Sequence, residues 1–439
     1  MTIATTSNAP RSRATPLPDS DLQVLSRFTR VRAWTLTGLA TLALAITLIH
    51  RQVLAALAVS VTTALGISEV KYGWLSSGLA GAFLIGSLPG ARLVQKIGPK
   101  VGLGLTVALT SIVIGLHSVV YSYSALLCLR IGMGLAASIA MPAATQTVHR
   151  VLPFKDRSRG IGLLYLGNSM GSAFCPLLAV TIESRVGWRD AFSWIALIGV
   201  LWIIAWSIVA SIGKTSQKQI DLEPGAVVVV DARTSVLQLA RIPGVLRGSL
   251  LVAAAAPVTL VMLIWAAKYL VTEHHVPQRH LGIYLWAPAL MFGLGSLMYG
   301  ELRARSTKTR AAARPPKGLV AQAACLCLTM TLVPLMYGPG ACILVASVAM
   351  LGAGGLYTLA TSDMLAHTPR PLVASTAGMT TIAQSLVYII ASPIFGKCVQ
   401  VSGNYHWVMI SAGLWVLPWT LLWLVDASLL RNQGAHRLT

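Results

Sequence analysis

Residues 318–362 read GLVAQAACLCLTMTLVPLMYGPGACILVASVAMLGAGGLYTLATS, a stretch without a single Asp, Glu, Lys or Arg. A helix crosses the hydrocarbon core of a bilayer with about 20 apolar residues, so this stretch is long enough for two crossings. Residues 101–129 form a second uncharged stretch. Backbone amides cannot remain unpaired in lipid, and neither stretch alternates like a strand of a membrane barrel. The sequence therefore predicts membrane-spanning helices.

The composition of the whole chain agrees with this prediction. Of its 439 residues, 55% are hydrophobic and 11% are charged, whereas a soluble domain carries about 25% charged residues. Twelve spans can be placed, near residues 33–65, 72–94, 101–121, 123–148, 159–182, 190–212, 248–272, 281–302, 318–337, 341–364, 373–399 and 406–427. We expect an all-α integral membrane protein with two pseudo-symmetric six-helix bundles, the layout of transporters built from two repeats. The expected parts are a tail (1–32), two bundles (33–212 and 248–427), a linker (213–247) and a second tail (428–439).

The basic residues are distributed unevenly between the predicted loops. The net charge is +21, and of the 34 Lys and Arg, 26 lie on the tails and even-numbered loops and 5 on the odd-numbered loops. This asymmetry follows the positive-inside rule, so we expect both termini in the cytoplasm and the protein in the cell (inner) membrane. Nucleic-acid binding would need the cations gathered on one solvated face, which this distribution excludes. The polar first 32 residues show no cleavable signal pattern, and we expect them to form a disordered tail.

No enzyme, metal or cofactor pattern is present. The six cysteines all lie in apolar stretches without metal-ligand spacing, which favours a packing role. Only Glu273 could join His274, His275 and His280 as a metal ligand in their shared loop. A phosphate-binding loop of the Walker type is absent. We therefore expect no cofactor, no metal site and no enzymatic activity.

Several segments together resemble the anion:cation symporter family of major facilitators over residues 35–425. In the first bundle they are Ile49-His50-Arg51-Gln52-Val53-Leu54 leading to Leu65-Gly66-Ile67, Gly73-Trp74-Leu75 through Gly86-Ser87-Leu88-Pro89-Gly90, Leu129-Arg130-Ile131 through Gly134-Leu135-Ala136-Ala137, and Met141-Pro142-Ala143. Later segments are Gly187-Trp188-Arg189, Trp265 with Tyr269-Leu270, and Ala374-Ser375-Thr376-Ala377-Gly378. The resemblance implies a secondary transporter of a small organic anion that works by symport and alternating access.

The chain departs from the family pattern at the acidic positions. His50 stands where the family has the aspartate of its first helix, and Ala137 stands where it has a glutamate. In the family these acids are associated with proton coupling. Gln95 likewise replaces the aspartate of the loop between the second and third spans. Burial and the neighbouring Arg51 both disfavour the charged imidazole, so we expect a neutral His50 and weak coupling to protons.

Two arginines are the main candidates for substrate binding. Arg51 lies midway through an apolar stretch, where it either extends to the outer headgroups or binds an anion in a central cavity through two parallel hydrogen bonds. The resemblance favours the cavity. Arg130, about two turns into its span, either snorkels, caps carbonyls of a neighbouring helix or joins the same site. An uncompensated charge in the membrane costs at least about 2–3 kcal/mol, so arginines without acids indicate a bound anion.

Other polar side chains are candidates for the same cavity. Lys268 snorkels outward or lines the cavity mouth. The remaining candidates form packing hydrogen bonds or bind substrate alongside His50: they are Asn168, Gln384, Tyr165 and Tyr284. Asp363 and His117 are interpreted as structural residues.

We expect transport of a small organic anion, such as a sugar acid, an aromatic acid or a dicarboxylate, by a monomer in the lipid bilayer, with protons as a second candidate partner. One alternative is an organophosphate exchanger of the same superfamily. Those exchangers carry a second arginine at a position that corresponds to the region of Thr259 here. Another alternative is a transporter-like sensor that binds a ligand without net transport.

Overall fold

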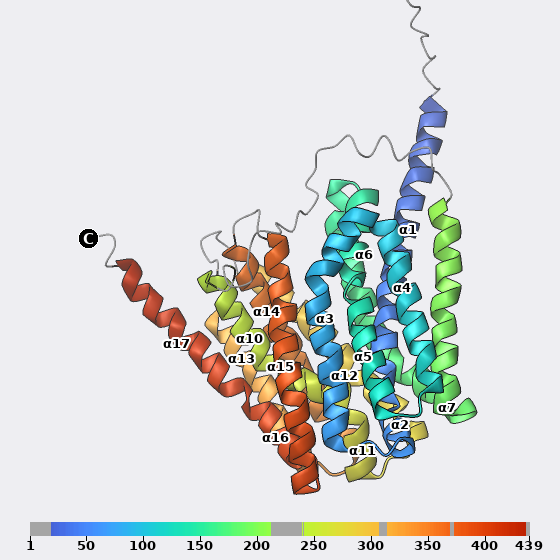
Figure 1. Cartoon of the computed structure of the whole chain (residues 1–439). Helices are drawn as coiled ribbons and strands as arrows, with labels where there is room; N and C mark the ends of the chain where they lie inside the picture. Colours follow the sequence, from blue (N-terminus) through green and yellow to red (C-terminus); the bar gives the residue numbers. More distant parts are fainter. Residues whose placement is uncertain (1–18, 212–238, 240, 307–313, 369–372, 436–439) are drawn as a thin grey trace, which may run out of the picture.

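The computed structural model describes residues 19–211, 239, 241–306, 314–368 and 373–435, and these residues are almost entirely helical. Figure 1 shows long helices packed side by side in two groups, one on each side of the molecule. α1 begins and α17 ends towards the same end of the bundle, which we call the tail end (Figure 1). The opposite end, where α2 and α11 lie, is called the far end.

The first half runs from α1 to α7. Its helices are α1 (Asp19–Ala56), α2 (Ala58–Ala64), α3 (Glu69–Ile97), α4 (Pro99–Leu116), η1 (His117–Val119), α5 (Tyr123–Ala137), α6 (Ala140–Val151) and α7 (Phe154–Ser211). α1 is helical from Asp19, so the expectation of a disordered tail up to residue 32 is wrong for residues 19–32; residues 1–18 lie outside the described part. The remaining division into parts stays a prediction.

The second half runs from α10 to α17, and helix breaks are frequent in it. Its helices are α10 (Pro243–Leu260), η3 (Val261–Trp265), α11 (Ala266–His274), η4 (Gln278–His280), α12 (Gly282–Ser306), α13 (Lys317–Leu328), η5 (Thr329–Leu335), α14 (Pro339–Ala366), α15 (Val373–Ser402), α16 (His406–Leu414) and α17 (Val416–Ala435). The segment η3 is a π-helical turn that joins α10 to α11. One span is therefore built from three elements, with an irregular turn in its middle.

Within the described residues, 10 helices are long and apolar enough to cross a membrane, or up to 11 when the bent pair in α3 counts as one span. The stretch Arg159–Ser211 is 53 residues long, which is more than twice what one crossing requires. Gly187 interrupts it with φ 84° and ψ 166°, a conformation that glycine adopts without steric cost. The fold is thus the predicted all-α membrane architecture, while the count of twelve spans stays a prediction.

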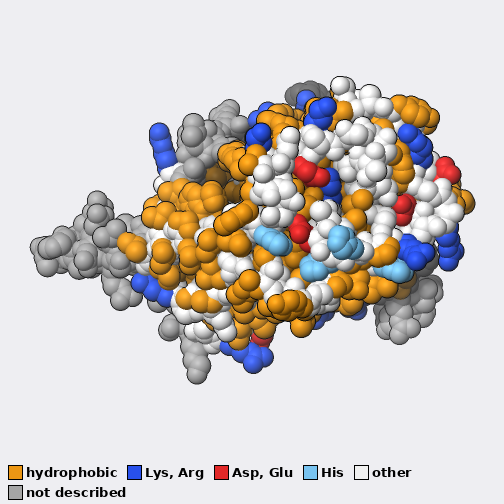
Figure 2. Space-filling model, turned by 90° about the horizontal axis from the view of Figure 1, so that it is seen from below, with side chains coloured by type: hydrophobic (Ala, Val, Ile, Leu, Met, Phe, Trp, Pro, Cys, Tyr) orange, Lys and Arg blue, Asp and Glu red, His pale blue; other side chains and the backbone are white. Residues whose placement is uncertain are grey.

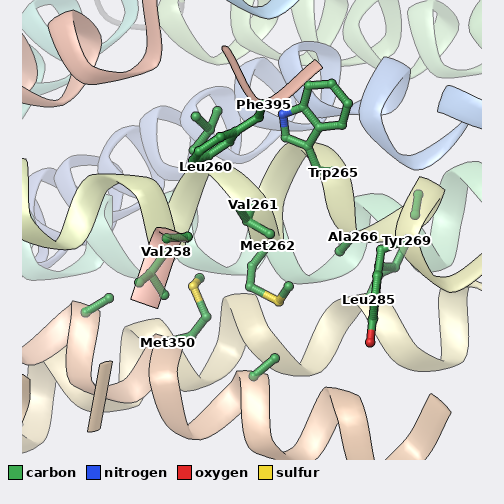
Figure 3. Close-up of a cluster of buried hydrophobic side chains, with 14 of the residues drawn as sticks. Val258, Leu260, Val261, Met262, Trp265, Ala266, Tyr269, Leu285, Met350 and Phe395 are labelled. Carbon is green, nitrogen blue, oxygen red and sulfur yellow. The ribbon is translucent and has the colours of Figure 1, made fainter. Parts of the chain in front are cut away.

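The two halves are joined most closely towards the far end. α3 packs along α15, α7 packs along α12, and α2 touches α11. The larger hydrophobic cluster contains residues of both halves, whereas the second cluster is confined to the first half. Figure 3 shows part of the larger cluster, where Met262 and Trp265 of η3 lie among side chains of neighbouring helices such as Met350 and Phe395.

Small residues permit this close packing. A Cβ atom on Gly73 of α3 would overlap the backbone of Ser392 in α15, and a Cβ atom on Gly396 of α15 would overlap the backbone of Glu69. The contact between α3 and α15 therefore depends on glycine on both sides. Hydrogen bonds reinforce it: the Ser77 hydroxyl donates to the Ile389 carbonyl at 2.9 Å.

Candidate functional site

Arg51 and Arg130 lie together in the first half. Arg51, in α1, is partly buried, and its guanidinium lies 4.4 Å from the centre of the Phe83 ring in α3. Arg130, in α5, is 2% exposed and donates from Nη1 to the Arg51 carbonyl at 3.0 Å. Within the described residues, neither guanidinium has a carboxylate partner, and the Nε atom of each is buried without a hydrogen bond. Arg130 thus holds the α1 backbone at the residue that carries the Arg51 side chain.

The second half contributes neutral polar groups. Gln384 and Tyr388, four residues apart on α15, are joined by a hydrogen bond from Gln384 Nε2 to the Tyr388 hydroxyl at 3.3 Å. The Tyr388 hydroxyl in turn donates to Thr259 Oγ1 of α10 at 3.0 Å. The Tyr357 hydroxyl of α14 lies beside Thr259 and Gln384, and it is buried without a hydrogen bond among the described residues. Three helices of the second half therefore present a cluster of hydroxyl and amide groups.

One interaction links the two sets of groups across the boundary between the halves. Arg51 lies within electrostatic range of Tyr388, although the two residues belong to different halves. A guanidinium on one side can hold a carboxylate through two parallel hydrogen bonds. Hydroxyl and amide groups on the other side can exchange hydrogen bonds with a hydroxylated carbon chain.

Three residues of this candidate site were among those selected from the sequence, and their role in binding stays a prediction. Arg51, Arg130 and Gln384 are brought to it, whereas Tyr388 and Tyr357 were not among the candidates. The position of Tyr388 carried a usable signal, because residues four apart share a helix face and Gln384 had been selected. Tyr357 carried no such signal, since only the packing of α14 against α10 and α12 brings it near.

Tyr165 and Asn168 lie on α7 beside Ser172, at spacings of three, four and seven residues that place them on one helix face. Tyr165 is 57% exposed and Asn168 is exposed. Ser172 donates to Gln52 Oε1 of α1 at 3.0 Å, and both line a cavity between the halves. Tyr165 and Asn168 therefore belong to the face of α7 that points along the boundary between the halves, nearer the tail end.

His50 is turned into the first half. Its side chain is fully buried, with Nδ1 3.1 Å from the Thr110 hydroxyl of α4 and Nε2 3.3 Å from the Ile195 carbonyl of α7. The structure thus does not bring the ring to the polar groups of the second half. The helical period explains this, because adjacent residues point about 100° apart and Arg51 occupies the other direction. A role for His50 in binding stays a prediction.

Lys268 and Tyr284 are placed apart from Arg51. Lys268, in α11, is 5% exposed, and its ammonium lies 2.6 Å from Glu69 Oε1 of α3. Its charge is therefore paired with a carboxylate of the other half, which differs from snorkelling; a place at the cavity mouth stays a prediction. Tyr284, near the start of α12, is partly buried and packs against the larger hydrophobic cluster. No group of three or more His, Cys, Asp or Glu able to hold a metal ion occurs in the described part of the chain.

Beyond the Arg51 region, the boundary between the halves is nearly closed towards the far end. The cavity there measures ≈ 20 Å³ and is lined from the first half by Gln52, Ala55 and Ser172 and from the second by Met262 and Ala267. A volume of about 10–15 Å³ holds one water molecule, so this cavity has room for little more than one water. Tyr72 adds a hydrogen bond to the Ile264 carbonyl at 2.7 Å, and Gln278 adds one to the Ala56 carbonyl at 2.9 Å.

The chain is similar in sequence to proteins named as galactonate, hexuronate and anion transporters. The protein named "Probable L-galactonate transporter" of Escherichia coli K12 is 26% identical over 66% of this chain and 67% of its own length. The hexuronate transporter of the same organism is 21% identical over 61% of this chain and 64% of its own. "Probable anion transporter 3, chloroplastic" of Arabidopsis thaliana is 32% identical, but over 36% of this chain and 31% of its own length.

The fold is also shared with solved structures. A bacterial homologue of the human lysosomal transporter Spinster, solved in an inward-facing and occupied conformation, superposes with a TM-score of 0.72. That match covers 90% of this chain and 97% of the other at 16% identity. A family model described as Major Facilitator Superfamily matches residues 34–392. The chain belongs to the Major Facilitator Superfamily, a family of membrane transporters and not of enzymes.

Proposed function

We propose that the protein moves a small organic anion, a hydroxylated carboxylate of the sugar-acid kind, across the membrane by alternating access. The observation that carries the proposal is the Arg51 guanidinium, which has no carboxylate partner among the described residues and lies against Phe83 at the boundary between the halves. An uncompensated charge within the membrane is costly. A bound carboxylate would compensate it.

The second half supports a hydroxylated anion. Tyr388, which interacts electrostatically with Arg51, is neutral, and so are the Thr259 hydroxyl and the Gln384 amide that are hydrogen-bonded to it. Such groups suit hydroxyls better than a second carboxylate, which would remain without a cation there. The names of the galactonate and hexuronate relatives point to the same chemical class.

The organophosphate alternative is less well supported. It requires a second arginine near position 259, where this chain has Thr259, whose hydroxyl donates to the Ala256 carbonyl at 2.9 Å and accepts from Tyr388. A phosphate would then meet cations from the first half alone. We therefore prefer a carboxylate.

The orientation of the protein in the membrane is inferred from the basic loops. The tail end would face the cytoplasm of a cell with the protein in its inner membrane, according to the positive-inside rule. Reporter fusions within residues 214–247 and after residue 439 test this orientation. A signal from outside the cytoplasm at either fusion would contradict it.

The function is tested by uptake of labelled galactonate and galacturonate into vesicles that contain the purified protein. Arg51→Lys keeps the charge but loses the planar two-bond contact, so we expect uptake to fall at least about 100-fold, the loss that corresponds to about 2.7 kcal/mol. Arg305→Lys is the matched control, because Arg305 is an exposed arginine paired with Glu301.

Uptake by Arg51→Lys at the rate of the control would contradict the proposed site. Binding of the anion without uptake above that of empty vesicles would favour the sensor alternative. Uptake of a sugar phosphate in preference to both carboxylates would favour the organophosphate exchanger.

A further inference from the structure

A groove lies on the surface of the first half towards the tail end. Its walls are formed by residues between Gly86 and Lys96 of α3 and between Leu135 and Ile139, where α5 passes into α6. It measures ≈ 460 Å³, within the range of about 300–1,000 Å³ that is usual for ligand sites. The candidate anion site around Arg51 contributes none of the described residues that line it. The groove is therefore a separate place at which this chain can hold a ligand.

The groove lies at a bend in α3 and has a closely packed floor. α3 bends by 50° between Glu69–Ser87 and Pro89–Ile97, and a proline is a common cause of such a bend. On the floor, a Cβ atom on Gly86 would lie 2.6 Å from the Ser138 hydroxyl, and one on Gly90 would lie 3.2 Å from it. Because the two helices touch through glycine beneath the groove, their contact sets its shape.

The part of the groove nearer the middle of the membrane is apolar. Leu135 and Ile139 line it, and the exposed side chains of Ile85 and Ile131 continue the apolar surface one turn further towards the far end. From Ile85 to Lys96, a helix advances about 16 Å towards the tail end. One leaflet contributes about 15 Å to the hydrocarbon core of a bilayer. The surface is thus about as long as one leaflet is deep.

The tail-end part of the groove is cationic. Arg92 and Lys96 line it, and both side chains are exposed. They are four residues apart and therefore share one face of α3. None of the described residues that line the groove is acidic. Gln95 stands where the family pattern has an aspartate, so the segment Pro89–Ile97 carries two cations and no acid.

An amphiphilic anion matches both parts of the groove. Arginine and lysine bind phosphate through charge-assisted hydrogen bonds, and basic sites between membrane helices bind the headgroups of anionic lipids. A small soluble anion would leave the apolar wall without a partner. A choline lipid would place its ammonium close to two cations, which repel it. A phospholipid with a net negative charge avoids both disadvantages.

We propose that the groove between α3 and α5 binds one anionic phospholipid of the leaflet at the tail end. Its phosphate contacts Arg92 and Lys96, and one acyl chain packs against Leu135 and Ile131 towards the middle of the membrane. The lipid thereby packs against the bent part of α3. The inference does not rest on the proposed transport function, so its test needs no transported substrate.

The test detects lipids bound to the purified full-length protein by native mass spectrometry in detergent. Dioleoylphosphatidylglycerol and dioleoylphosphatidylcholine are titrated separately, and the Kd of the first lipid bound is determined for each. These lipids share their acyl chains and differ in headgroup charge. We therefore expect the unchanged protein to bind the phosphatidylglycerol about tenfold more tightly or better.

Arg92→Gln combined with Lys96→Gln tests the cationic part. We expect the Kd for the phosphatidylglycerol to rise about tenfold or more, and the Kd for the phosphatidylcholine to stay within about twofold. Lys100→Gln combined with Arg305→Gln is the charge-matched control, because both side chains are exposed and neither lines the groove. This control should bind the phosphatidylglycerol within about twofold of the unchanged protein.

Leu135→Trp tests the apolar part, because the larger indole occupies space in the groove. Phosphatidylglycerol binding should weaken about fivefold or more, since the acyl chain loses its apolar contact. Ile112→Trp, on an exposed face of α4 outside the groove, is the matched control and should leave binding unchanged. Glycerol 3-phosphate, which has the phosphate but no acyl chain, should not displace the lipid.

Equal affinity of the unchanged protein for the two lipids would overturn recognition of an anionic headgroup. An equal loss of affinity in the groove variant and in its charge-matched control would show that net charge, and not this groove, attracts the lipid. Displacement by glycerol 3-phosphate would assign the two cations to a soluble phosphate instead. Unchanged phosphatidylglycerol binding by Leu135→Trp would place the lipid outside the groove.

Discussion

Arg247 and Lys268 are buried cations on the same broken span, one near the start of α10 and the other in α11, and each is paired with a carboxylate. Arg247 makes two contacts with Asp363 of α14, at 3.3 Å from Nε and 3.2 Å from Nη2, inside its own half. Lys268 makes one contact with Glu69, in the other half. Figure 2 looks onto the far end, where acidic and histidine side chains lie among hydrophobic ones.

The difference corresponds to what each contact must do. A pair inside one half moves as a rigid unit, so a planar two-bond contact that is costly to break stabilises that half. His367 adds a further contact to Asp363 at 3.2 Å. In the proposed alternating-access cycle, a pair across the halves would form and break, and a flexible ammonium with a single contact suits that behaviour.

Breaking the contact inside the second half should have the largest effect on stability. Asp363→Asn leaves Arg247, whose side chain is 3% exposed, without its counter-charge. We expect the free energy of unfolding to fall by about 3–5 kcal/mol, measured by thermal unfolding in detergent. Glu301→Gln, which breaks an exposed pair with Arg305, should change it by about 0.5 kcal/mol or less. Equal melting temperatures of the two variants would show that the buried pair stabilises the protein no more than the exposed pair.

Breaking the contact between the halves should cost less. Lys268→Gln leaves Glu69, whose side chain is 25% exposed, near enough to water to be hydrated. We therefore expect a loss of about 1–2 kcal/mol in the same melting experiment. A loss as large as that of Asp363→Asn would show that Lys268 is a fixed structural cation, and it would contradict the expectation that this contact breaks during transport.

Removing Arg51, which has no carboxylate partner among the described residues, should have the smallest effect on stability. Arg51→Gln relieves an uncompensated charge, so we expect the free energy of unfolding to stay within about 0.5 kcal/mol or to rise. The melting temperature of the unchanged protein should rise when the transported carboxylate is added, because a ligand that binds the folded state stabilises it. That increase should be absent in Arg51→Gln. A strongly destabilised Arg51→Gln would indicate a packing role instead.

The sequence could predict the fold well because lipid imposes it. The uncharged stretches had to be helices, and their boundaries follow closely; for example, the span expected at 341–364 is α14, Pro339–Ala366. The beginning of α1 was missed, because residues 19–32 are too polar to signal a span and yet are helical. An apolar composition indicates which residues contact lipid. It does not indicate that a helix continues beyond the lipid.

The candidate site could be predicted only in part. Arg51 and Arg130 could be selected from the sequence because a charge within an apolar stretch is costly, and their role in binding stays a prediction. The partner of Lys268 could not be found, since Glu69 is 199 residues away in the sequence and only the docking of the two halves brings them together. His50 was assigned because it stands at the family's aspartate position beside Arg51, although adjacent residues on a helix point in different directions.

The π-helical turn at Val261–Trp265 has a consequence for the phase of this span. A π turn accommodates one residue more than an α turn, so side chains after it are rotated by about 100° relative to an uninterrupted helix. A regular helical wheel continued from α10 through α11 would therefore place the Lys268 side chain on the wrong face of the span. Loss of one residue from the turn would restore the regular wheel, rotate Lys268 away from Glu69 and leave both charges inside the closed interface without each other.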